Sequence, residues 1–380
     1  MTAAAPRDGY DVAIVGAGIA GVSVAYFAAE HARVLLLERE PQPAMHSTGR
    51  SAAMFMESYG SAQVRALTRA SRPFLEQPPQ GFADVPLVSP RGALYIGSAE
   101  QAGALHALQA SLLSEGCPAA VLSSAEAIER VPVLRTQAAA LAVYDPLAMD
   151  VDVHALHQAF LRGARARGAR LVCGADVLGL TQAAGRWQID TAAGRFQART
   201  VVNAAGAWVD ELAARGGVLP IGIQPRRRSA FVFEVPAGMA IAHWPCVSDV
   251  AESFYFKPEA GLLLGSPANA DPVPPHDVLP EELDIATGIA RIEAATTLQI
   301  RRPRRTWAGL RSFVADGDLV GGFDPRVPGF FWVAAQGGYG IQTSAAMGAL
   351  CAASLLGRAP PEWAAAALEQ GARLGVRRMA

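Results

Sequence analysis

Near the N-terminus an 18-residue stretch without a charged residue runs from Val12 to Ala29. Its length is compatible with a membrane span or with a buried strand followed by a helix. Three glycines decide between these alternatives. Gly16, Gly18 and Gly21 follow the order G-x-G-x-x-G directly after the apolar run Val12–Val15. The pattern therefore predicts a buried parallel strand, a glycine turn and a helix rather than a membrane span.

In a nucleotide-binding fold each of these glycines has a distinct role. Gly16 lets the chain turn out of the strand, Gly18 lets the backbone approach a pyrophosphate, and Gly21 lets the helix pack close to the sheet. A second strand is predicted over residues 32–38 and ends at Glu38, 17 residues after Gly21. A carboxylate at this distance accepts hydrogen bonds from an adenosine ribose. We therefore interpret the segment as a phosphate-binding unit.

Farther along the chain the apolar pattern alternates between helical and strand periods. Prolines 78 and 79 end a helix that begins near residue 61, and Ser124 is expected to cap a short helix. The other predicted elements are a turn and strand at 87–97, an alanine-rich helical region after it, a helix ending near Gly168, a strand at 170–173, a meander over 186–210 with a hairpin turn around Ala193 and Gly194, a strand-rich block at 224–264, a helix at 281–296, and a strand, glycine turn and helix over 329–357.

The chain thus carries a strand–glycine–helix unit at each end. Two such units predict one nucleotide-binding domain built from separated segments, with the strand-rich inserts forming a second domain over it. The expected fold class is α/β, with mixed α+β character: a Rossmann-like domain and a mixed β-sheet substrate domain. We expect the first domain to comprise residues 1–85, 151–215 and 306–380, and the second to comprise residues 86–150 and 216–305.

Composition excludes several function classes. A net charge of −1 over 380 residues gives no global field toward nucleic acid or anionic lipid, and the basic clusters at 225–228 and 301–305 are interpreted as solvated surface. The four cysteines are widely spaced, which favours free thiols over disulfides or a metal site. The N-terminus lacks a basic, apolar and small-residue targeting pattern, so a cytoplasmic protein without a transmembrane segment is expected.

Several longer motifs point to one family. They are VGAGIAG at 15–21 with Glu38, HSTGRSAA at 46–53, VVNAAGAWVD at 201–210, RRSAF at 227–231, SFYFKPEAGLLLGSPANADP at 253–272, TWAGLRSFVADGDLV at 306–320 and FFWVAAQGGYGIQTSAAMG at 330–348. In these motifs and their order the chain resembles the D-amino acid oxidase and glycine oxidase superfamily of FAD-dependent oxidoreductases. Within it, the chain is most similar to bacterial FAD-dependent D-arginine dehydrogenases.

The resemblance implies a noncovalent FAD on the Rossmann-like domain. The segment 46–53 would line the isoalloxazine, and a helix N-terminus following Gly337 would stabilise negative charge on the reduced flavin. The FAD-binding residues implied are Gly16, Gly18, Ile19, Ala20, Gly21, Glu38, Arg39, Ser47, Thr48, Arg50, Ser51, Ala52, Ala53, Val177, Ala205, Gly206, Trp208, Gly309, Gly337, Gly338, Tyr339, Gly340, Ile341, Gln342 and Thr343.

The resemblance also implies oxidation of a D-amino acid by hydride transfer from Cα to flavin N5, which gives an imine and then a 2-oxo acid and ammonia. A guanidinium fork suits the substrate carboxylate, and family positions assign this role to Arg228 and Arg311. Tyr59 and Tyr255 would contribute hydroxyl groups, Gly338 a backbone carbonyl for the amine, and Gln342 would lie nearby. Strand alternation places Arg227 on the opposite face, and Arg226 is a second neighbour that could compete. No catalytic base is evident.

The chain departs from the D-arginine enzymes where the substrate side chain is bound. Ala93 stands where the family has a glutamate, Met54 where it has a histidine, and Met56 where it has a threonine. A pocket without the acid and with two flexible apolar side chains favours neutral, apolar D-amino acids over D-Arg and D-Lys. If Glu57 faces the pocket, however, cationic substrates are accepted again.

Three alternatives remain open at this point. The same fold could carry an oxidase of glycine, sarcosine or another small amine that releases hydrogen peroxide. The glycine motif also occurs in nicotinamide-dependent dehydrogenases, and a non-catalytic or membrane-anchored flavoprotein is the third alternative. For a dehydrogenase, the family suggests a quinone or a respiratory carrier as the electron acceptor.

Overall fold

The opening glycine segment folds as the pattern predicts. In the computed structural model, which describes residues 9–376, β1 (Tyr10–Val15) leads through the glycine turn into α1 (Ile19–Ala28), and β2 (Val34–Leu37) lies parallel to β1. Residues 1–8, on which part of the expectation about targeting rests, lie outside the described residues. Within residues 9–376 no helix has both the length and the apolar character needed to span a membrane.

The first sheet gathers eight strands from separated parts of the chain. Its order is β10-β11-β12-β1-β2-β9, with β20 parallel to β12 and β19 antiparallel to β20. The strands not yet bounded are β9 (Arg170–Val172), β10 (Val177–Ala183), β11 (Arg186–Thr191), β12 (Gly194–Asn203), β19 (Val320–Phe323) and β20 (Phe330–Ala334). Segments near both ends of the chain thus meet in one sheet, as expected for a Rossmann-like domain assembled from distant pieces.

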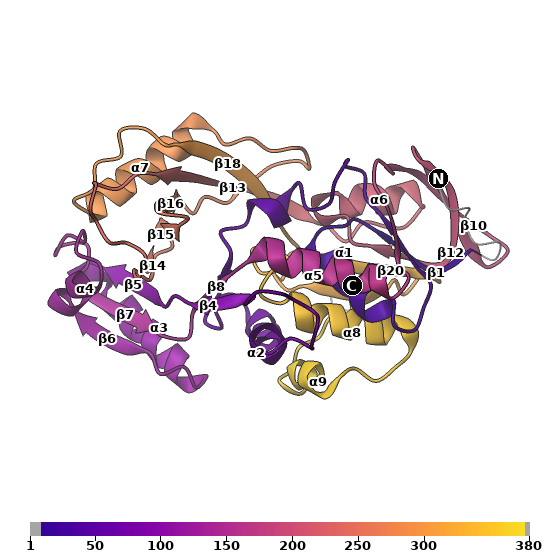
Figure 1. Ribbon diagram of the computed structural model, residues 1–380, viewed down its shortest axis with the longest axis horizontal. Coiled ribbons are helices and arrows are strands. Elements are labelled where there is room, and N and C mark those ends of the chain that lie inside the picture. Colours follow the sequence, from indigo (N-terminus) through magenta and orange to yellow (C-terminus); the bar gives the residue numbers. More distant parts are fainter. Residues whose placement is uncertain (1–8, 377–380) are drawn as a thin grey trace.

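Helices cover both faces of this sheet (Figure 1). On one face α1 packs against α8 so closely that a Cβ on Gly348 would lie 2.8 Å from the Cβ of Ser23. The helices of this face are α1, α2 (Ala62–Glu76), α5 (Val153–Ala166), α8 (Ser344–Leu356) and α9 (Glu362–Glu369). On the other face α6 (Val209–Arg215) packs with the β10–β12 meander. The buried strands therefore lie between two apolar layers.

The second sheet forms the other half of the molecule (Figure 1). Its order is β17-β13-β16-β15-β14-β5-β7-β6, and β18 pairs with β13. Its strands are β5 (Ala93–Gly97), β6 (Ala120–Ser123), β7 (Leu141–Asp145), β13 (Gln224–Phe233), β14 (Cys246–Asp249), β15 (Tyr255–Glu259), β16 (Leu262–Ser266), β17 (Asp271–Pro272) and β18 (Arg305–Phe313), with helices α3 (Ala102–Ser114), α4 (Ser124–Arg130) and α7 (Glu282–Ala295).

Two expectations need correction here. Residues 306–313, expected in the nucleotide-binding domain, belong to β18, which pairs with β13 along its whole length in the second sheet. Ser124 does not cap α4, because it is the first helical residue. Ser123 is the cap, and it forms a reciprocal capping box with Glu126. The two adjacent serines cannot be distinguished by apolar period alone.

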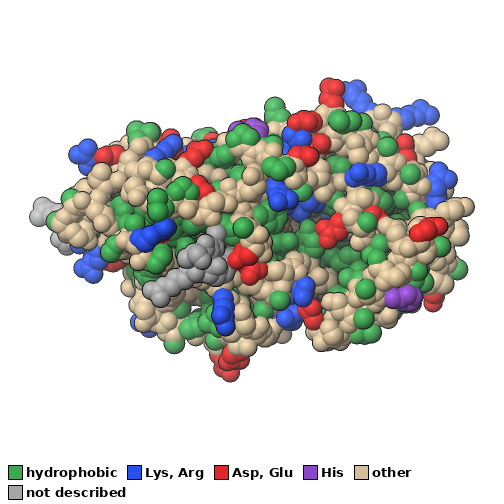
Figure 2. Space-filling view, turned by 180° about the vertical axis from the view of Figure 1, so that it is seen from behind, with side chains coloured by type: hydrophobic (Ala, Val, Ile, Leu, Met, Phe, Trp, Pro, Cys, Tyr) green, Lys and Arg blue, Asp and Glu red, His purple; other side chains and the backbone are tan. Residues whose placement is uncertain are grey.

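A small three-stranded sheet lies between the two halves (Figure 1). It consists of β3 (Met54–Phe55), β4 (Val88–Pro90) and β8 (Met149–Val151). A 3-10 helix at Ser47–Arg50 precedes it. This connection places residues 46–60 next to both large sheets, which is where the candidate site forms. On the face shown in Figure 2, acidic and basic side chains are interspersed.

Candidate active site

Three adjoining chambers run from the glycine turn to the space between the two sheets. The first and second share Gly18, Ser47, Thr48 and Gly206 among their lining residues, and the second and third share Arg228. The structure thus brings together most of the residues that the sequence assigned to one site. Four assigned residues line none of the three chambers: Gly21, Ala93, Tyr339 and Thr343.

The glycine turn has the form that a pyrophosphate requires. Gly16 has φ of 104°, and a Cβ on Gly21 would lie 1.9 Å from the carbonyl oxygen of Gly16. A Cβ on Gly18 would approach Oγ1 of Thr48 to 3.2 Å. The hydroxyl of Thr48 also accepts a hydrogen bond from the backbone N of Ile19, at 3.0 Å. Side chains larger than hydrogen would close this approach, so the turn fits a phosphate-bearing ligand at the N-terminus of α1.

Two buried polar residues hold the turn in place. Glu38, at the end of β2, is 8% exposed and accepts a hydrogen bond from the backbone N of Ala17 at 2.9 Å, yet it still lines the first chamber. His157 on α5 lies behind the turn, with Nε2 2.8 Å from the carbonyl oxygen of Ala17. Because the partner is a carbonyl, Nε2 carries the proton and donates it. The sequence offered no signal for this role of His157.

The buried histidine leads to a pH prediction. Burial lowers the pKa of His157, so unfolded chains take up a proton below pH about 6.5 that the folded protein resists. The free energy of unfolding should therefore fall as pH decreases below that value, by at most about 1.4 kcal/mol per pH unit, until the lowered pKa is reached. His157→Gln keeps a donor without titrating, so its stability should depend less on pH.

Urea denaturation of the FAD-loaded protein at a series of pH values from neutral to mildly acidic measures this difference. His106→Gln, at an exposed position on α3, is the matched control and should keep the wild-type pH slope. An unchanged slope in His157→Gln would contradict the assignment.

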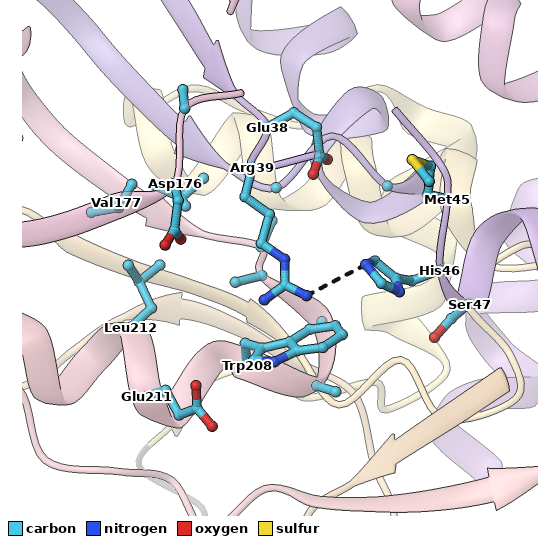
Figure 3. A pocket seen from close by; sticks show the side chains of 18 of the residues that line it. Glu38, Arg39, Met45, His46, Ser47, Asp176, Val177, Trp208, Glu211 and Leu212 are labelled. Atoms are coloured by element: carbon cyan, nitrogen blue, oxygen red, sulfur yellow. Dashed lines mark hydrogen bonds between the residues drawn. The ribbon is translucent and has the colours of Figure 1, made fainter. Parts of the chain in front are cut away.

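The far end of the first chamber offers flat surfaces suited to a purine. The guanidinium of Arg39 lies 3.8 Å above the ring of Trp208, and one of its nitrogens is 3.4 Å from Nε2 of His46 (Figure 3). Val177 lines the same chamber. Stacking on a guanidinium or an indole binds an aromatic base. The first chamber therefore fits the nucleoside half of a dinucleotide.

The second chamber joins the glycine turn to the loop after β20. The residues assigned to FAD that line it, besides those shared with the first chamber, are Ile19, Ala20, Arg50, Ser51, Ala52, Gly309, Gly337, Gly338, Gly340 and Ile341. The guanidinium of Arg50 is committed elsewhere. It donates to the carbonyls of Val278 and Ala308 at 3.0 and 3.1 Å and forms an ion pair with Asp277 at 2.5 Å. Arg50 therefore fixes the loop over β18 rather than offering a free charge.

The third chamber contains two guanidinium groups on one face of the second sheet. β13 and β18 are antiparallel, with Arg226 opposite Arg311 and Arg228 opposite Gly309. Arg228 donates from Nε to the backbone carbonyl of Asn269 at 2.6 Å, and Arg311 donates from Nη1 to the hydroxyl of Tyr59 at 3.2 Å. Among residues 9–376 neither arginine forms an ion pair with an acid. Burial and the neighbouring Arg311 lower the pKa of Arg228. This direction is expected for two adjacent positive charges that have no ion-paired acid in the described part of the chain.

Gly338 allows this arrangement. A Cβ on Gly338 would lie 2.9 Å from Cζ of Arg311, so only glycine lets the guanidinium lie against this backbone. The preceding residue, Gly337, donates its backbone N–H to the carbonyl of Ser312 at 3.0 Å and thereby ties the loop to β18. Tyr255 completes the polar wall, since it lines both the second and the third chamber.

The two neighbouring arginines lie outside the chamber, and strand alternation accounts for Arg227. Arg227 lies on the other face of β13, where it pairs with Asp271, Glu281 and Asp284. Arg226 is exposed and lines none of the chambers. The adjacent basic residues therefore do not compete with Arg228.

Several assigned residues support the chamber in other ways than expected. Gln342 lines it, but its amide is hydrogen-bonded to both backbone groups of Met56 and to the hydroxyl of Thr68. Tyr339 packs edge-on against Tyr59, with ring centroids 5.1 Å apart. Thr343 is fully buried, and its hydroxyl donates to the carbonyl of Tyr339 at 2.9 Å. These residues hold the walls of the chamber.

The residue expected to contact the substrate side chain, Ala93, is not positioned to do so in the structure. Ala93 is 1% exposed within β5 and does not line the third chamber, whereas Tyr95, two residues later on the same face, does. Glu57 does not line it either, because its carboxylate pairs with Arg72 at 2.6 Å. The acid that does line the chamber is Glu252, at a left-handed φ of 55° in the turn between β14 and β15.

Glu252 and four other lining residues were missed from sequence. Tyr95, Cys246, Ser248 and Ala268 complete the wall, which also carries Ala53, Met54 and Met56. Burial raises the pKa of the Cys246 thiol to about 12, so this group is neutral. These residues come from separate strands and turns of the second sheet, and no local motif marks them.

Comparison with known proteins agrees with this geometry. A family model described as "FAD dependent oxidoreductase" matches residues 11–354. Glycine oxidase of Geobacillus kaustophilus is 27% identical over 360 residues, which cover 90% of this chain and 92% of that protein. The crystal structure of glycine oxidase from the same organism superposes with a TM-score of 0.81 at 25% identity and covers 92% of this chain and 95% of that one. L-alpha-glycerophosphate oxidase from Mycoplasma pneumoniae with FAD bound has a TM-score of 0.83 at 16% identity, over 93% and 97% of the two chains, which shows a shared fold.

Proposed function

Because the chain belongs to the family of FAD-dependent oxidoreductases, we propose that it is an FAD-dependent D-amino acid dehydrogenase. The overall reaction converts a D-amino acid, water and an oxidised acceptor into a 2-oxo acid, ammonia and the reduced acceptor. FAD, when bound, supplies the hydride acceptor for this chemistry. The proposed electron acceptor is a quinone or a respiratory carrier.

One observation carries the proposal: two guanidinium groups without an acidic partner in the described part of the chain line the third chamber. A substrate carboxylate would supply the missing negative charge, and a planar fork binds it in a fixed orientation. Tyr59 accepts a hydrogen bond from Arg311, so its own proton is available for the same carboxylate. The backbone carbonyl of Gly338, beside Arg311, is the proposed acceptor for the amine. Anchoring both groups fixes the direction of the Cα–H bond.

The charges of the third chamber support a preference for neutral side chains. Its lining contains two cationic groups, Arg228 and Arg311, and one acid, Glu252. The carboxylate of a bound substrate brings the sum to zero when the amine is neutral. A cationic side chain would add an uncompensated charge to an enclosed site, which is unfavourable. Met54 and Met56 give the same wall flexible apolar surface.

The D configuration rests on the resemblance of the motifs to D-arginine dehydrogenases. In those motifs the arginine, tyrosine and glycine positions of this chain are kept, while the glutamate position is occupied by Ala93. We therefore propose an enzyme of the same reaction class with a different side-chain preference, one in which D-Arg and D-Lys are poor substrates.

A second candidate function is an oxidase of glycine, sarcosine or a related small amine. The similarity to glycine oxidase over 90% of this chain favours it. The two candidates differ in the fate of the electrons. An oxidase passes them to oxygen, so the purified protein should release hydrogen peroxide with substrate in air, whereas a dehydrogenase should require an added acceptor.

Steady-state assays with an artificial quinone acceptor test the side-chain preference. D-norvaline and D-methionine should give a kcat/KM about tenfold or more above that for D-arginine and D-glutamate, because each of the latter adds one uncompensated charge. Glycine and sarcosine belong in the same panel. A preference for D-arginine would refute the charge argument, and a preference for sarcosine would favour the second candidate.

A further inference from the structure

A buried carboxylate lies directly behind the third chamber. Asp145, the last residue of β7, is 1% exposed and does not line the chamber. Its Oδ1 accepts hydrogen bonds from the backbone N of Leu147 at 2.9 Å and from Sγ of Cys117 at 3.2 Å. Its Oδ2 accepts one from Oγ of Ser58 at 3.2 Å. All three partners are neutral donors, so the carboxylate acts as an acceptor at both oxygens.

This carboxylate fixes the direction of the next hydrogen bond. A serine hydroxyl has one proton, and Ser58 donates it to Asp145. The hydroxyl oxygen of Tyr95 lies 3.0 Å from Oγ of Ser58, so the proton between them must come from Tyr95. Burial raises the pKa of Tyr95, which keeps that proton on the phenol. Tyr95 lines the third chamber, and the remaining valences of its oxygen are lone pairs.

The other polar groups on this side of the third chamber, those of Ser248 and Glu252, also offer hydrogen-bond acceptors. Ser248 also lines the chamber, and its hydroxyl donates to the carbonyl of Asp249 at 3.3 Å. Glu252 contributes acceptor oxygens. By contrast, Arg228 and Arg311 are donors only. The chamber is therefore divided into a donor group, suited to a carboxylate, and an acceptor group formed by Tyr95, Ser248 and Glu252.

We infer that Asp145, through Ser58, makes Tyr95 a hydrogen-bond acceptor that selects the substrate side chain. The inference rests on the proposed function and narrows it to D-amino acids whose neutral side chain carries an O–H or N–H donor. Tyr95 is the contacting residue, and Ser58 and Asp145 are positioning residues. We confine that donor to a neutral hydroxyl, amide or ring N–H, because two guanidinium groups, Arg228 and Arg311, already line the chamber.

Three substrates of nearly equal size test this polarity. D-homoserine carries a hydroxyl donor, O-methyl-D-serine carries an ether acceptor, and D-norvaline carries neither. In the wild-type holoenzyme kcat/KM for D-homoserine should exceed that for O-methyl-D-serine by about tenfold, because only the hydroxyl of D-homoserine has a proton to donate to Tyr95. The ratio within one preparation cancels any loss of active protein.

Asp145→Asn should turn Tyr95 from a hydrogen-bond acceptor toward the substrate into a donor, with little change in the shape of the chamber. The amide oxygen must take the place of Oδ1, because Leu147 and Cys117 donate there, so the amide nitrogen faces Ser58 and donates to it. Ser58 then donates to Tyr95, and the phenol proton turns toward the substrate. The D-homoserine to O-methyl-D-serine ratio should then fall to near one, because Tyr95 offers a donor that both the hydroxyl and the ether oxygen can accept. Cys117→Ala removes a partner of Asp145 without changing this direction and should keep the wild-type ratio.

Two further variants keep the test decisive if Asp145→Asn does not fold. Ser58→Ala leaves the proton of Tyr95 without its acceptor, and Tyr95→Phe removes the oxygen, so both should lower the same ratio. A wild-type ratio near or below one would overturn the inference, and so would a ratio that stays unchanged in all three variants. Failure of every D-amino acid, including D-norvaline, to reduce the flavin would instead refute the proposed function itself.

Discussion

Replacing Arg311 with methionine will lower kcat/KM for the best D-amino acid by about 10³-fold, because removing one partner of an enclosed charge pair costs roughly 2–5 kcal/mol. Arg311 donates to Tyr59 and lies against Gly338. Its loss would remove a proposed ligand of the substrate carboxylate and release Tyr59, the second proposed ligand, from its hydrogen bond. Both kcat and KM should change, since the carboxylate also orients the Cα–H bond.

The same substitution should leave the protein as stable as the wild type or slightly more stable. In the described part of the chain Arg311 has no acidic partner, and its charge lowers the pKa of Arg228. Removing one of two like, enclosed charges relieves that repulsion. This relief offsets the loss of the contacts with Tyr59 and Tyr255, which raise the pKa of Arg311 despite its burial. A loss of activity together with an unchanged or higher melting temperature identifies a functional residue rather than a damaged fold.

Arg226→Met is the matched control for Arg311→Met. Arg226 lies directly opposite Arg311 in the β13–β18 pairing but is exposed and lines no chamber. Its kcat/KM should stay within about twofold of wild type, as is usual for surface positions. Equal losses in both variants would show that the effect arises from the sheet and not from the substrate site.

Replacing Gly21 with alanine will abolish FAD retention, so that the protein is purified without its yellow colour or fails to fold. The added Cβ would lie 1.9 Å from the carbonyl oxygen of Gly16. Neither backbone segment can yield, because Gly16 connects β1 to α1 and its own N–H donates to the carbonyl of Leu37 at 2.8 Å. Separating α1 from β1 disturbs the phosphate-binding turn and the core beneath it.

Two other glycine variants separate loss of the cofactor from loss of the fold. Gly18→Ala brings a Cβ to 3.2 Å from Oγ1 of Thr48, a contact that a small side-chain shift can relieve. It should fold and bind FAD more weakly, as measured by the absorbance ratio of flavin to protein. Gly103→Ala, in α3 with open space around it, should retain FAD and gain about 1 kcal/mol of stability from helix propensity. Full FAD content in Gly21→Ala would contradict the account of the turn.

The nucleotide-binding half could be predicted from sequence because its signals are local. The strand, the glycine turn and the acid at Glu38 follow one another closely along the chain, and Gly21 is required by its contact with Gly16 within the turn itself. Alternation along β13 was sufficient to separate Arg227 from Arg228. Period and spacing therefore predict residues whose roles are set within one element.

The side-chain end of the site could not be predicted in the same way. Glu252 enters through a left-handed turn, a backbone conformation that sequence does not mark for glutamate. Glu57 was a candidate for binding a cationic substrate side chain. In the structure its carboxylate instead accepts a hydrogen bond from Arg72, 15 positions later on α2. The predicted domain boundary at residue 306 was wrong because the alternation of apolar and polar residues in β18 would suit a strand of either sheet. Each of these outcomes depends on tertiary pairing rather than on local pattern.

Anaerobic mixing of the purified holoenzyme with the two enantiomers of norvaline tests the central claim most directly. The D enantiomer should bleach the visible absorbance band of the flavin within about a second, the timescale of an ordinary enzyme turnover. The L enantiomer should leave the band unchanged over the same time. Bleaching by the L enantiomer, or by neither, would contradict the assignment of the third chamber to D-amino acids.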